Sequence, residues 1–131
     1  MYLLDEKILR GLHNLMRDKG VNNVNISMFS PEQQKIIYEG YGEQFLIYNG
    51  LWFMMNAVVS YALAKNIEMV NKKLKSELDY AFKAHDYDYA TLCARLLGEN
   101  TTVEFLKNYN PSNKYESIYN ELIGFINKVK S

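Results

Sequence analysis

The longest uncharged segment of this chain is the feature that most limits how the chain can fold. It covers 21 residues, 44–64, between Glu43 and Lys65, and reads QFLIYNGLWFMMNAVVSYALA. As a helix it would be about 30 Å long, enough to cross a bilayer or a whole small domain. Whether this segment faces lipid or protein therefore decides the class of protein.

Polar side chains within the segment favour a protein interior. Asn49, Asn56 and Ser60 are seven and four residues apart, so they share one stripe of a helix. In lipid, an amide without a hydrogen-bond partner would cost about 2 kcal/mol or more. Trp52 lies mid-segment, whereas membrane-spanning helices tend to place tryptophan at an interface. We expect a buried central helix whose polar stripe bonds to tyrosines of neighbouring helices or faces a partner subunit. Membrane insertion and an exposed assembly surface are the alternatives.

The helix that contains this segment has the clearest start in the chain. Ser30 is placed as an N-cap, Pro31 fits the first helical position, and Gln33 completes a capping box. We expect one long helix from this point to about residue 65, bent at the glycines Gly40 and Gly42. A break at these glycines is the alternative.

Apolar periodicity divides the rest of the chain into further helices. They are expected at about residues 3–19, 67–85, 86–97, 101–109 and 114–129. Gly20 and Gly98 follow two of the predicted ends, and Asp86 is placed as an N-cap. With 131 residues and 48% hydrophobic residues, the chain can bury the core of one domain. We predict a single all-α domain over residues 1–131, a helical bundle around a long central hydrophobic helix.

Charged residues of the predicted helix 67–85 fall four apart with opposite signs. Lys73 and Glu77 form one such pair, which is typical of a solvated helix face. Leu51 lies in the middle of the uncharged helix. We therefore expect Leu51→Asp to be severely destabilising and Lys73→Asp to be tolerated.

The sequence gives little support to enzyme chemistry. A carboxylate-bridged di-iron site needs Glu-x-x-His on two helices, but Arg10 and Phe82 stand three residues before His13 and His85. Cys93 lies in an apolar helix and is interpreted as a small buried hydrophobic residue. Phosphate-binding loops and hydrolase motifs are missing from the sequence. We predict a protein that is not an enzyme and holds no metal or cofactor.

Aromatic residues indicate association instead. Eleven tyrosines in a chain of this length exceed what core lining needs, and tyrosine is enriched at interfaces. The predicted interaction surface consists of Tyr41, Tyr48, Asn49, Trp52, Asn56, Tyr87 and Tyr89. The formal net charge is zero, which argues against a protein that coats nucleic acid.

Three segments carry a resemblance to a known group of proteins: FLIYNGLW, HDYDYA and KNYNPSNKYESIYNEL. In these segments, and in its short length, the chain resembles the small helical virion proteins of hyperthermophilic archaeal viruses. The resemblance implies a coat or structural subunit that packs by helix–helix contacts. The resemblance extends loosely over the whole chain and includes no specific motif, so it assigns no functional residue.

These observations predict a non-enzymatic structural or assembly protein, a coat-type subunit of a virion. Its partners would be copies of itself or other virion proteins, and its location the virion or otherwise the cytoplasm. The second hypothesis is a small helical binding module that regulates or inhibits a larger protein, and the third is a membrane-associated helical protein. Self-association that depends on concentration distinguishes the first hypothesis from the second, and detergent dependence identifies the third.

Overall fold

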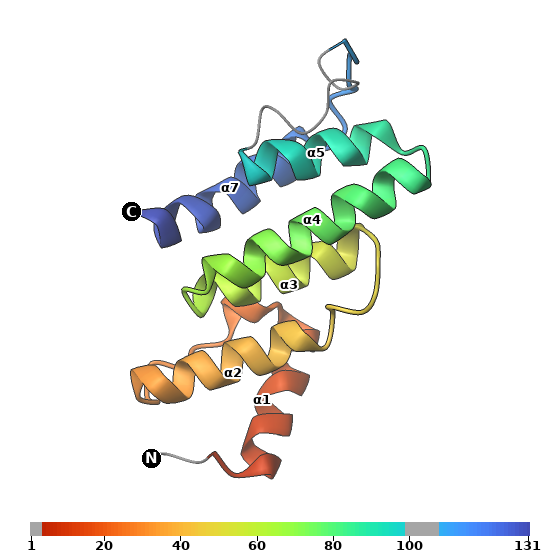
Figure 1. Ribbon diagram of the computed structural model, residues 1–131. Helices are drawn as coiled ribbons and strands as arrows, with labels where there is room; N and C mark the ends of the chain where they lie inside the picture. Colours follow the sequence, from red (N-terminus) through yellow and green to blue (C-terminus); the bar gives the residue numbers. More distant parts are fainter. Residues whose placement is uncertain (1–3, 99–107) are drawn as a thin grey trace.

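The computed structural model describes residues 4–98 and 108–131, and all regular structure in these two ranges is helical (Figure 1). The helices are α1 Glu6–Lys19, the short 3₁₀ helix η1 Val21–Asn23, α2 Pro31–Glu43, α3 Leu51–Leu63, α4 Ile67–Lys83, α5 Tyr87–Leu97 and α7 Glu116–Lys130. The all-α prediction is confirmed for these residues. The helix predicted at 101–109 lies outside the described ranges.

The helices from α2 to α5 alternate in direction along the chain, and each packs on the next. Figure 1 shows α1 crossing below α2, and α7 lying beside α5. Helix α3 contacts α2, α4 and α7, so it occupies the centre of the fold. Seven of its 13 residues are buried.

The prediction of one long helix through residues 31–65 is wrong. The chain leaves the helical path after Glu43, and α3 begins only at Leu51. The intervening loop, residues 44–50, ends at Gly50, whose φ of +128° is a conformation that side chains rarely adopt. The uncharged segment therefore supplies one surface loop and one short central helix.

The two glycines of α2 do not break it. A Cβ atom at Gly42 would lie 2.8 Å from the ring of Tyr61, and one at Gly40 would lie 3.1 Å from the His13 ring. These glycines allow α3 and α1 to approach α2 closely. The break comes one residue after Gly42, where the backbone is held by contacts distant in the sequence.

The polar residues of α3 find partners within their own helix. The Ser60 hydroxyl donates to the Asn56 carbonyl oxygen at 2.6 Å, and the Asn56 side chain donates to the Trp52 carbonyl oxygen at 2.8 Å. The expected hydrogen bonds to tyrosines of other helices are not among those that the structure shows for these two residues. Within the described ranges, every helix is too short or too polar to cross a membrane.

Candidate functional site

Three large apolar side chains are exposed within six residues of the chain, where the α2–α3 loop leads into α3. Ile47 is 80% exposed, Tyr48 51% and Trp52 53%. Asn49, between them, is also exposed. We call these four residues the 47–52 patch. The patch is the candidate site because these three exposed apolar side chains lie close together in the chain.

The exposed rings of the patch pack on less exposed aromatic rings. The ring of Phe53 stacks on Tyr48 at 5.1 Å and meets Trp52 edge-on at 5.2 Å. Phe45 meets Trp52 edge-on at 5.3 Å, and its other side contacts the buried ring of Tyr41. The exposed rings of Tyr48 and Trp52 therefore both contact Phe53, and Phe45 connects Trp52 to the buried Tyr41.

The backbone of the loop is held by Lys73 of α4. The Lys73 ammonium group donates to the carbonyl oxygens of Phe45 at 2.9 Å, Leu46 at 3.2 Å and Tyr48. These three carbonyl groups lie beyond Glu43, the last residue of α2, in the loop that leads to α3. Lys73 thus holds the backbone of the α2–α3 loop from a different helix.

The loop also depends on Glu77, one turn after Lys73. Its Oε1 atom accepts hydrogen bonds from the Gly50 amide at 2.7 Å and from the Tyr89 hydroxyl at 2.6 Å. Its Oε2 atom lies 3.6 Å from the Lys73 ammonium group. We call Lys73 and Glu77 together the α4 clamp.

Both side chains of the clamp have no exposed surface, so the prediction of a solvated Lys73–Glu77 pair is wrong. Burial lowers the pKa of Lys73, and the nearby Glu77 carboxylate opposes this shift. The ion pair and the hydrogen bonds of Lys73 Nζ and Glu77 Oε1 offset part of the cost of burying these charges, although Glu77 Oε2 makes no hydrogen bond. Lys73→Asp would put a second carboxylate beside Glu77 and is no longer expected to be tolerated.

Leu51 also differs from its prediction. It is partly exposed at the first position of α3 rather than fully buried. A carboxylate is favoured near a helix N-terminus, so Leu51→Asp is not expected to be severe.

The predicted interaction residues lie in three environments. Tyr48, Asn49 and Trp52 form the exposed patch, and Asn56 is partly buried one turn after Trp52. The remaining three are Tyr41, Tyr87 and Tyr89, of which Tyr41 and Tyr89 lie in the core and Tyr87 is partly buried at the α4–α5 junction. Tyr41 and Tyr89 are corrected to core residues, because their hydrophobic rings fill space between helices.

Sequence reasoning missed three residues of this site. Ile47 is not among the predicted interaction residues, although it lies in the uncharged segment beside Tyr48. The opposite charges of Lys73 and Glu77 predict a solvated pair, although both residues follow Val70 at helical spacings of three and seven. That spacing places them on the face of Val70, which is buried.

Both ring nitrogen atoms of His13 form hydrogen bonds within the fold. Its Nε2 atom bonds the Ile37 carbonyl oxygen at 3.0 Å, and its Nδ1 atom bonds the Gln44 side-chain amide at 3.0 Å. Burial lowers the pKa of His13. In residues 4–98 and 108–131, no three His, Cys, Asp or Glu side chains gather where they could hold a metal ion.

Comparison of the chain with known proteins identifies no relative. No family model, curated protein or solved structure matches the chain.

Proposed function

We propose that this protein is a non-enzymatic assembly subunit that binds a second copy of itself through the 47–52 patch. The observation that carries the proposal is the exposure of Ile47 and Tyr48, on a loop held by buried charges, and of Trp52 in the first turn of α3. A rigid aromatic surface loses little conformational freedom on binding, which favours association.

Charge supports a second copy as the partner. Residues 44–64 contain no charged side chain, and the whole chain has zero formal net charge. In a two-fold dimer the same surface faces itself, so a surface with an excess of one sign of charge would repel its copy. A neutral patch on a neutral chain avoids this repulsion.

The size of the patch sets the expected strength. The three exposed side chains offer on the order of 300 Å² of surface. A standard interface buries about 800 Å² on each partner. The patch therefore supplies the centre of an interface, and the association of an isolated pair is expected to be weak and dependent on concentration.

The setting that we propose for such a subunit is a virion coat, on the strength of the sequence resemblance given above. The second candidate remains a binding module whose patch contacts a different, larger protein. The same exposed surface would serve it, but the neutrality of the patch favours the first candidate.

The test is size-exclusion chromatography with light scattering on the wild type and two variants, from about 1 µM to 1 mM. The wild type should increase in mass with concentration. Ile47→Asp should stay monomeric, because association would bury an unpaired carboxylate from each copy in an apolar interface. Ile47 is 80% exposed, so this change should leave the fold intact.

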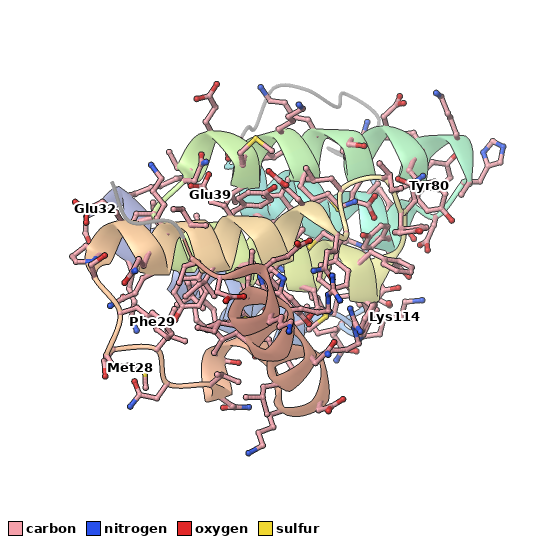
Figure 2. All side chains as sticks on the ribbon, turned by 90° about the horizontal axis from the view of Figure 1, so that it is seen from below. Met28, Phe29, Glu32, Glu39, Tyr80 and Lys114 are labelled. Carbon is pink, nitrogen blue, oxygen red and sulfur yellow. The ribbon has the colours of Figure 1, made fainter. Side chains whose placement is uncertain are left out.

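Met28→Asp is the matched control. Met28 is 72% exposed and lies before the first residue of α2, whereas the patch lies after the last residue of α2. The 13 residues of α2 span about 20 Å between the two. Figure 2 shows Met28 and Phe29 at one end of the molecule and Tyr80 at the other. This variant should associate like the wild type. A wild type that stays monomeric throughout would overturn the proposal.

A further inference from the structure

The α4 clamp supplies the partners of several main-chain groups in the loop. Between Phe45 and Gly50, three carbonyl groups bond Lys73 and one amide bonds Glu77. Four main-chain groups within six residues therefore depend on two side chains that lie more than 20 residues later in the chain.

These bonds lie inside the patch and next to it. The carbonyl group of Tyr48, a patch residue, is one of those bound by Lys73. Gly50, bound by Glu77, is the N-cap of α3 and precedes Trp52 by two residues. The clamp thus fixes the backbone on both sides of Asn49.

Without the clamp, these main-chain groups would have to bond water. Buried backbone groups in native proteins are nearly always paired, so the loop would turn them toward solvent. Tyr48 and Trp52 would then be displayed in many arrangements rather than one. Binding would have to order them, which weakens association.

We propose that Lys73 and Glu77 are positioning residues that hold the 47–52 patch in the conformation that binds a second copy. This inference rests on the proposed function and identifies what controls its surface. The clamp also joins the patch to α5, because the Tyr89 hydroxyl bonds the same Glu77 oxygen as the Gly50 amide. A change in α5 that releases Tyr89 would loosen the patch.

The test uses Lys73→Met, which keeps most of the side-chain volume and removes the ammonium group. Lys72→Met is the matched control, because Lys72 is the exposed neighbour in the same helix. Two quantities are measured at a temperature where circular dichroism shows all variants folded. They are amide hydrogen exchange of residues 45–51 and the self-association constant from light scattering.

In Lys73→Met, exchange in the loop should rise about tenfold or more while the buried helix α3 stays protected. Association should weaken about tenfold or more. Lys72→Met should change neither quantity. A Lys73→Met loop as protected as the wild type would overturn the proposal, and so would an exposed loop with unchanged association.

A second variant covers the case in which Lys73→Met fails to fold. Tyr89→Phe keeps the ring and removes one hydrogen bond to Glu77. It should raise exchange at the Gly50 amide and weaken association less than Lys73→Met would, and an unchanged Gly50 amide would contradict the clamp. If the wild type itself does not associate, the proposed function fails, while loop exchange still tests whether the clamp orders the patch.

Discussion

Among single residues, His13 makes the stability of the fold depend on pH. As a neutral imidazole it bonds the Ile37 carbonyl oxygen and the Gln44 side chain, and the Gln44 oxygen accepts from Arg17 at 3.0 Å. A second ring proton would meet the Gln44 amide group and lie near the positive charge of Arg17. Burial, and to a smaller extent Arg17, accordingly lower the pKa of His13 below 6.5.

The lowered pKa predicts the direction of a pH effect. Between the folded pKa and 6.5, the unfolded chain binds more protons than the folded chain, so stability falls as pH falls through this window. Urea unfolding from about pH 7.5 to 5.5 avoids the range in which carboxylates titrate. The wild type should lose stability over that range and His13→Gln should lose less. Equal slopes in the wild type and in His13→Gln would contradict this account.

For the two residues of the clamp, the sequence can predict burial but not the groups that they bond. Their spacing from Val70 places both on the buried face of α4, so their burial could have been predicted. Their role could not, because the carbonyl groups that they bind belong to Phe45, Leu46 and Tyr48, far away in sequence. Opposite charges four apart occur far more often on solvated helix faces, and this general pattern led to the wrong prediction.

At the scale of elements, α3–α4 and α4–α5 are joined by the same turn. Lys65 and His85 occupy the left-handed region, with φ of 60° and 56°. The next residue in each turn, Asn66 or Asp86, caps the following helix by accepting from the amide three residues on. In both turns the amide of this cap residue also bonds a carbonyl oxygen five residues back, at 2.8 and 2.9 Å.

This geometry predicts that His85→Gly stabilises the protein. Glycine adopts a positive φ without the strain of a side chain, which should outweigh its greater freedom in the unfolded chain and raise stability by up to about 1 kcal/mol. The neighbouring Ala84 has right-handed geometry, so Ala84→Gly should lower stability by about 0.5–1 kcal/mol. Thermal melts compare the two, and a lower melting temperature for His85→Gly would show that its bond to Tyr87 matters more than the strain.

Helix boundaries followed the local signals where these act within one turn. The capping box of Ser30 and Gln33, the Asp86 cap and the left-handed Gly98 are all present, so these boundaries were predictable. The end of α2 was not. No breaker stands at Glu43, so the continuous apolar sequence predicts a continuous helix, whereas contacts with α4 hold the loop beyond Glu43.

At the scale of the whole molecule, the short central helix α3 and the exposed 47–52 patch come from the same uncharged segment. Its later part is buried between α2, α4 and α7. Its earlier part is turned outward by the loop, held there by the α4 clamp. Other large apolar side chains, among them Ile8 and Met28, are exposed elsewhere, but Ile47, Tyr48 and Trp52 are the three that lie within six residues of each other.

Trp52 reports on this surface directly, because it is the only tryptophan of the chain and is 53% exposed. The most direct measurement is quenching of its fluorescence by acrylamide, as a function of wild-type protein concentration. If two copies meet through the 47–52 patch, the quenching constant should fall as the protein is concentrated and the emission should shift to shorter wavelength. Quenching that stays constant while light scattering shows association would place the interface elsewhere and contradict the account.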